Sequence, residues 1–80
     1  MLWNIPSPGD VVTVYAMEDV DVYSEWSRSG AHVGRIRPKT LCVVLETLKM
    51  KTGSACRVCS GDVVGWINHF FLRVVSGPTG

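Results

Sequence analysis

The chain has 80 residues and a net charge of +1; 46% of its residues are hydrophobic and 19% are charged. This length allows one small domain, and this composition is typical of a globular protein and excludes a disordered polar tail. No apolar run approaches the roughly 20 residues that a membrane-spanning helix needs, and residues 1–6 lack the basic and apolar regions of a secretory signal. We therefore expect a cytoplasmic protein with no membrane partner.

The charges are unevenly distributed along the chain. Residues 1–25 contain five acidic residues and no lysine or arginine, whereas residues 28–57 contain seven basic residues and one acid, Glu46. Two interpretations are open. Either the two halves neutralise each other across adjacent loops, as on many soluble domains, or the basic residues form a surface of their own.

The first half of the chain contains one clear strand signal. Residues 11–16 are rich in β-branched side chains and predict a first strand. Residues 17–40 show little periodicity and are interpreted as a long irregular loop. Within this loop, residues 20–23 are a candidate short strand and residues 32–36 are a candidate extended segment.

The second half contains stronger strand signals, joined by short turns. Residues 41–48, 55–59 and 63–67 predict three consecutive strands. Residues 68–72 are too few for a stable α-helix and favour one 3₁₀ turn, and residues 73–75 predict a last short strand. We therefore expect an all-β fold of five strands, with a long first loop and a 3₁₀ turn before the last strand.

The three cysteines are an odd number, which argues against a disulfide framework. In an extended strand, Cys56 and Cys59 point to opposite faces and lie about 10 Å apart, whereas zinc holds each ligand sulfur at about 2.3 Å. We expect Cys56 to pack in the core beside Val58, with Arg57 and Cys59 on the other face. No metal site is expected.

The closing segment resembles a known fold family. Residues 64–67 and 70–72 present a glycine, an aromatic and an aliphatic residue, then a turn and further hydrophobic residues. With the Pro-Gly-Asp-Val-Val sequence at residues 8–12, this pattern resembles the small SH3-like β-barrels encoded by tailed phages and in marine viral sequence. The resemblance implies a five-stranded SH3-like barrel.

The resemblance also implies a division of the chain and a place in the cell. It spans residues 8–75, so residues 1–7 are interpreted as a lead-in and residues 76–80 as a flexible tail. A viral protein of this kind would act in the cytoplasm of its host. Many proteins of this kind have no assigned role, and a fold alone does not supply one.

Eukaryotic signalling SH3 domains bind polyproline helices in an aromatic groove. By position, the residues that match parts of this groove are Tyr15, Trp66 and either Phe70 or Phe71. However, Ala55 and Cys56 stand where the groove needs a tryptophan, and Asn68 replaces the proline of the 3₁₀ turn. These departures argue against recognition of PxxP motifs.

We expect a non-enzymatic binding or assembly module that uses the face of Trp66 for a protein partner or for self-association. The candidate contact residues are Trp66, Phe70, Tyr15 and Trp26. An exposed tryptophan is a frequent interface anchor. The alternative is that Trp66 is covered by the loop at residues 17–40.

The alternative function is that of a nucleic-acid-binding accessory protein that uses the basic loops 35–39 and 49–51. The residues concerned are Arg35, Arg37, Lys39, Lys49 and Lys51. If these loops meet on one side of the barrel, they can bind phosphate without sequence preference, and binding then weakens steeply with salt.

An enzyme is not expected. The sequence shows no phosphate-binding glycine loop and no arrangement that orients a nucleophile beside a base. We therefore assign no catalytic residues and no cofactor, and His69 is interpreted as a partly covered surface residue.

Overall fold

The computed structural model describes residues 5–26, 30–51 and 53–76. Its elements are the strands β1 (Val11–Val14), β2 (Val20–Tyr23), β3 (His32–Ile36), β4 (Leu41–Met50), β5 (Gly53–Ser60), β6 (Val63–Asn68) and β7 (Leu72–Ser76), and the 3₁₀ helix η1 (His69–Phe71). The expected all-β class and the 3₁₀ turn before the last strand are confirmed. No helix among the described residues is long and apolar enough to span a membrane.

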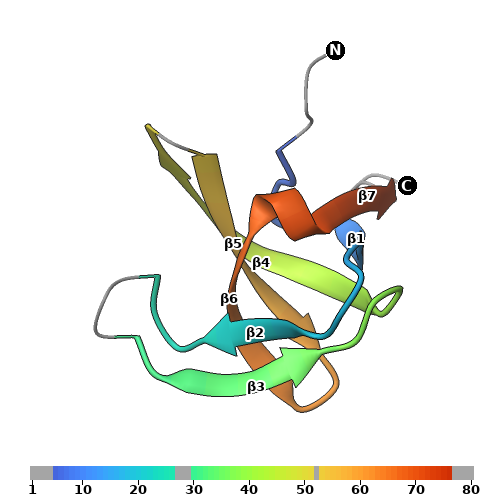
Figure 1. The fold of residues 1–80 in the computed structure, drawn as a ribbon. Coiled ribbons are helices and arrows are strands. Elements are labelled where there is room, and N and C mark those ends of the chain that lie inside the picture. The colour runs from blue at the N-terminus through green and yellow to red at the C-terminus, as the bar shows by residue number, and fades with distance from the viewer. Residues whose placement is uncertain (1–4, 27–29, 52, 77–80) are drawn as a thin grey trace.

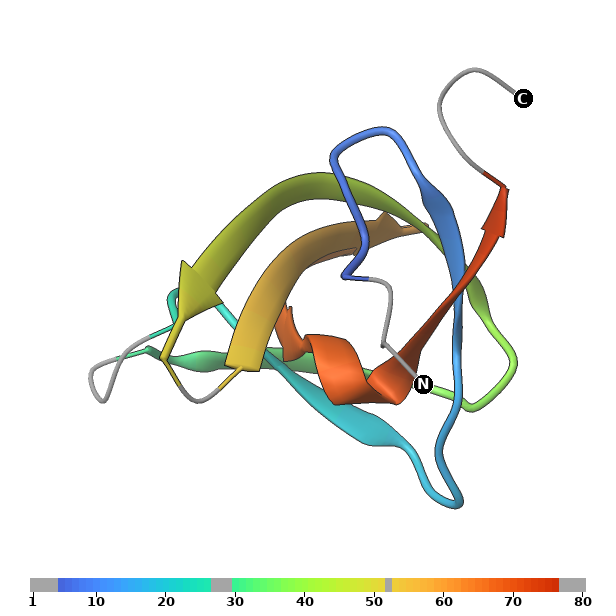
Figure 2. The same ribbon diagram turned by 90° about the horizontal axis from the view of Figure 1, so that it is seen from above.

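All seven strands belong to one open sheet in the order β3-β2-β6-β5-β4-β1-β7 (Figure 1). Every pair of neighbours in this sheet is antiparallel. The sheet is strongly curved: β4 and β5 arch over one side of the molecule, while β2 and β3 lie along the other side (Figure 2). The expected five-stranded barrel is therefore wrong in strand number and in closure.

The difference from the expected fold lies in residues 17–40, which do not form one long loop. Strands β2 and β3 pair within this segment, with Val20 opposite Ile36 and Asp21 opposite Arg35. These residues form strands because buried and solvent-facing side chains alternate along each short segment. Val20, Val22 and Ile36 are buried, whereas Asp21 and Arg35 lie toward solvent.

The core is formed by the inward side chains of this curved sheet. Its buried members are Val12, Val14, Val20, Val22, Ile36, Cys42, Val44, Cys56, Val58, Ile67 and Leu72. The expected faces of β5 are confirmed, because Cys56 and Val58 are buried while Arg57 and Cys59 are only partly covered. Burial raises the pKa of the Cys42 and Cys56 thiols, so both pack as uncharged small apolar groups.

Strand β2 packs closely against β6 at Gly65. A Cβ atom at Gly65 would lie 2.6 Å from the carbonyl oxygen of Tyr23 and 2.6 Å from Cγ1 of Val22. Real side chains do not approach backbone this closely, so only glycine allows β2 to lie so near β6 here. The contact brings Tyr23 into register opposite Trp66.

The 3₁₀ helix η1 connects β6 to β7 and supports the hairpin between β4 and β5. The side chain of Asn68 caps it by accepting a 2.9 Å hydrogen bond from the backbone amide of Phe70. His69 is buried, and its Nδ1 lies 3.0 Å from the amide nitrogen and 2.9 Å from the carbonyl oxygen of Ser54. The expectation of a surface histidine is therefore wrong, because Ser54 provides a backbone partner for a buried imidazole.

Two residues of β6 test which face of the sheet holds the core. Ile67 is 0% exposed and Val64 is 40% exposed. We expect Ile67→Ala to lower the free energy of unfolding by about 3 kcal/mol, because it leaves a cavity among packed side chains. The matched change Val64→Ala should stay within about 0.5 kcal/mol of the wild type. Urea denaturation measures both, and equal losses would contradict the described faces.

Candidate functional site

Two adjoining clefts lie beside the connection from β1 to β2. The aromatic cleft has a volume of about 440 Å³, and its walls include Tyr23, Trp26 and Phe71. The apolar cleft has a volume of about 550 Å³ and is lined by Tyr15, Ala16, Met17 and Phe71. The two clefts share Ala16, Met17 and Phe71, so they form one continuous concave surface.

Backbone contacts hold the residues of these clefts together. The amide of Tyr15, just after β1, donates a 2.7 Å hydrogen bond to the carbonyl oxygen of Phe71 at the end of η1. This bond joins two segments that are far apart in the sequence and places both aromatic side chains on the same surface. Tyr15 is 65% exposed, Met17 is 98% exposed and Phe71 is 39% exposed, so this apolar surface faces solvent.

The aromatic cleft has two walls at a steep angle to each other. The rings of Tyr23 and Trp26 have centroids 6.4 Å apart and an interplanar angle of 66°. The Tyr23 ring makes a similar edge contact with His32, with centroids 6.0 Å apart. These two contacts fix the orientation of Tyr23.

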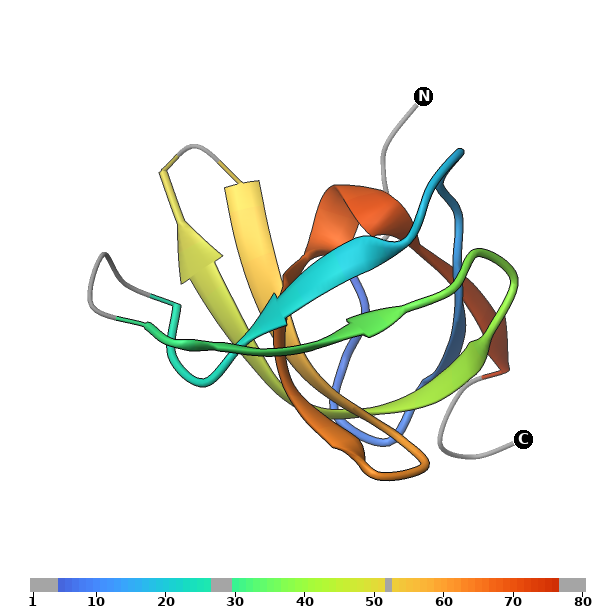
Figure 3. The same ribbon diagram turned by 60° about the horizontal axis from the view of Figure 1, so that its bottom comes forward.

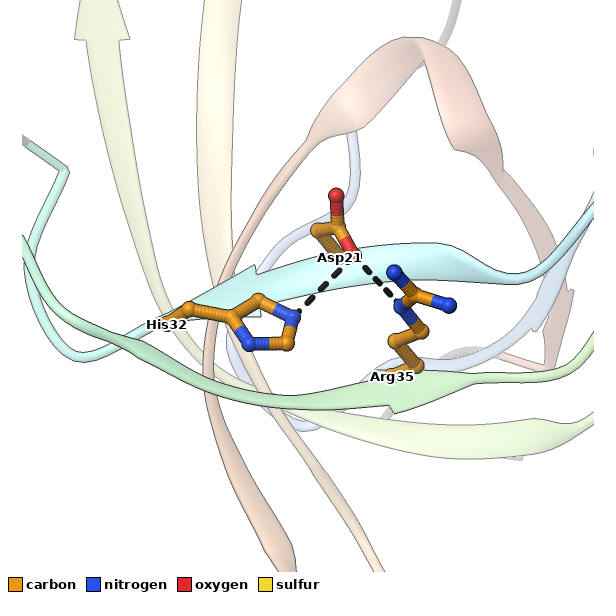
Figure 4. Close-up of polar contacts among 3 residues, drawn as sticks. All are labelled: Asp21, His32 and Arg35. Carbon is orange, nitrogen blue, oxygen red and sulfur yellow. Dashed lines mark hydrogen bonds and ion pairs between the residues drawn. The ribbon is translucent and has the colours of Figure 1, made fainter.

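Three acidic residues, Glu18, Asp19 and Asp21, also line the aromatic cleft. Oδ1 of Asp21 accepts a 2.9 Å hydrogen bond from Nε of Arg35 and lies 3.0 Å from Nε2 of His32 (Figure 4). The hydrogen bond from Arg35 is the main cause that lowers the pKa of Asp21; His32 also lowers it, and partial desolvation opposes both. Asp21 is thus held in its ionised form beside the rings.

Of the four predicted contact residues, the structure brings Tyr15 and Trp26 to these clefts but not Trp66 or Phe70. Trp66 lies on the outer face of β6, half-buried, in register between Tyr23 of β2 and Arg57 of β5. The two interpretations of Trp66 therefore each hold in part. A strand from segment 17–40 lies beside it, yet it is not fully covered.

Phe70 lies elsewhere, beside Gly53 at the turn end of the hairpin between β4 and β5. Its ring centroid is 4.1 Å from that of His69. A Cβ atom at Gly53 would lie 3.3 Å from the Phe70 ring, and Gly53 has a φ of +143° that favours glycine. Phe70 therefore packs against the hairpin, although about half of it is exposed.

The five basic residues of the alternative function do not form one surface. Lys49 and Lys51 lie at the hairpin between β4 and β5, whereas Arg37 and Lys39 lie in the turn between β3 and β4 (Figure 3). Strand β4 separates them, and its ten residues span about 30 Å of chain at ~3.3 Å per residue. Arg35 is paired with Asp21. The condition that the basic loops meet on one side of the fold is therefore not fulfilled.

The sequence interpretation missed Glu18, Asp19, Asp21 and Tyr23 as lining residues, and it named Phe71 only as an alternative to Phe70. The available signal was the alternation in residues 20–23, which puts Asp21 and Tyr23 on the outer face of a strand. Within the described ranges, no group of three or more histidine, cysteine or acidic residues is placed to hold a metal ion. No known protein family, curated protein or solved structure matches the chain.

The pairing of Asp21 predicts how its carboxyl group titrates. Because the folded state lowers this pKa, the pairing stabilises the fold above the ordinary aspartate pKa, and the effect is lost as the pH falls through the lowered value. We expect Arg35→Gln to raise the pKa of Asp21 toward its ordinary value, since the main cause of the shift is removed. Carboxyl-carbon NMR titration measures it, with Arg37→Gln as the control. An unchanged Asp21 titration in Arg35→Gln would contradict the pairing.

Proposed function

We propose that this protein is a non-catalytic, cytoplasmic module that binds a segment of a partner protein along the aromatic and apolar clefts. The observation that carries this proposal is the continuous concave surface of exposed aromatic and methionine side chains. Contiguous apolar surface of this kind marks interaction sites in soluble proteins. This proposal places the binding surface beside Trp26 and Tyr15 rather than at Trp66.

The charge of the aromatic cleft favours one class of partner. The described residues that line it include Glu18, Asp19 and Asp21 and no lysine or arginine. A partner segment that carries a basic side chain next to apolar residues complements both clefts. An acidic partner would be repelled by the same carboxylates.

Two other proposals have less support. We keep the SH3-like resemblance as a proposal. It is supported by the consecutive order of β6, β5, β4, β1 and β7 in the sheet and by the position of η1 before β7. A fold of this kind agrees with a binding role. Nucleic-acid binding by the basic loops is less favoured, because the loops lie at opposite ends of β4.

Selection of random peptides displayed on phage tests the proposed function. We expect enriched peptides that combine lysine or arginine with apolar residues, because this combination matches the lining of the two clefts. Phe71→Ser should weaken binding of such a peptide by about tenfold or more, as expected for a central aromatic contact. Val64→Ser is the matched control, since Val64 on strand β6 is about as exposed as Phe71 but lines neither cleft, and it should leave the affinity unchanged.

Several outcomes would contradict the proposed function. These are a failure to enrich any peptide, equal losses in the Phe71 and Val64 variants, or a dimer that forms without peptide and persists in Phe71→Ser. DNA or RNA binding at low salt that survives Phe71→Ser would favour the alternative. If Phe71→Ser does not fold, Met17→Ser replaces it, because the Met17 side chain is almost fully exposed.

A further inference from the structure

The walls of the aromatic cleft combine two features that recognise organic cations. Tyr23 and Trp26 present rings at 66° to each other, and Phe71 lines the same cleft. Aromatic faces attract cations through the ring quadrupole, and pairs of steeply inclined rings surround alkylated ammonium groups well. Asp21 adds an ionised carboxylate beside these rings, paired on one oxygen with Arg35, and Glu18 and Asp19 line the same cleft.

Resting on the proposed function, we propose that the aromatic cleft binds the dimethylated ammonium group of a methylated lysine in the partner segment. An unmodified ammonium carries three N–H donors, each of which needs an acceptor when water is displaced. The rings of Tyr23, Trp26 and Phe71 are weak acceptors at best. Each methyl group replaces one donor with apolar surface that the rings can cover, while the positive charge is kept.

A dimethylammonium group retains one N–H donor, and Asp21 provides the acceptor for it. Its Oδ1 already interacts with Arg35 and His32. Its second oxygen points away from both of these residues (Figure 4), and it has no hydrogen bond within the described part of the chain. One accepting oxygen matches the single N–H of a dimethylammonium group, whereas the trimethylated form has no N–H to donate.

The orientation of Asp21 is set before any ligand arrives. Arg35 and His32 approach it from the neighbouring strand β3, where Arg35 is in register with Asp21. His32 also contacts the ring of Tyr23. One network therefore fixes both the carboxylate and an aromatic wall, which reduces the ordering cost of binding.

The direct test uses lysine probes, blocked as the N-acetyl and C-methylamide derivatives, that carry zero, one, two or three methyl groups on Nζ. Each probe is titrated into the ¹⁵N-labelled protein, and amide and indole shifts give the dissociation constant. We expect the dimethylated probe to bind about tenfold more tightly than unmodified lysine, a gain within the range of cation–π contacts. The Trp26 indole signal should shift, and neutral acetyllysine should not bind.

Two variants separate the role of the ring from that of the carboxylate. Trp26→Phe keeps an aromatic wall and should retain most of the preference for the dimethylated probe, whereas Trp26→Leu should abolish it. Asp21→Asn should remove the advantage of the dimethylated over the trimethylated probe, because the charged acceptor is lost. Asp62→Asn, in the exposed turn between β5 and β6 and outside both clefts, is the control for a general loss of negative charge and should preserve this order of affinities.

The results distinguish this inference from the proposed function. If selected basic peptides bind and methylation of their lysine changes nothing, the inference is overturned while the binding function stands. Equal binding of acetyllysine would also overturn it, since the cleft would then recognise only apolar surface. Absence of binding by every lysine probe at millimolar concentration would overturn it as well.

Discussion

The approach of β2 to Gly65 on β6 attaches the β2–β3 hairpin to the rest of the sheet. Tyr23 and Trp66 form the described register pair between these two strands. The space that a side chain at Gly65 would need is occupied by the Tyr23 carbonyl and the Val22 side chain. The same approach lets Val22 reach the core, where it is fully buried. A local steric constraint thus determines how the sheet extends beyond β6.

The candidate site depends on this attachment. Asp21 and Tyr23 point outward from β2 because Val20 and Val22 point into the core. The aromatic cleft is therefore lined by the strand held at Gly65, by the connection before it, by Trp26 in the segment after it, and by Asn68 and Phe71. The outward face of a short strand and an exposed turn together carry the chemistry, while the buried face of that strand fixes their position.

Regular strands were predictable from the sequence, whereas contacts between distant segments were not. Residues 41–48 were recognised because a long run of apolar and β-branched residues needs little context. The pairing of β2 with β3 was missed because each strand is short and the alternation is brief. The burial of His69 depends on Ser54, and the cleft depends on Phe71 meeting Tyr15. Such pairings arise from the folded chain and leave no local pattern.

The most direct test of the central constraint is Gly65→Ala compared with Gly34→Ala. A Cβ atom at Gly34 would meet Val63 side chains at an ordinary 3.4 Å, so this control reproduces the effect of alanine on the unfolded chain without the clash. We predict that Gly65→Ala lowers the free energy of unfolding by about 1–3 kcal/mol relative to the control and speeds amide exchange in β2 and β3. Equal stabilities and unchanged exchange in the two variants would contradict the account.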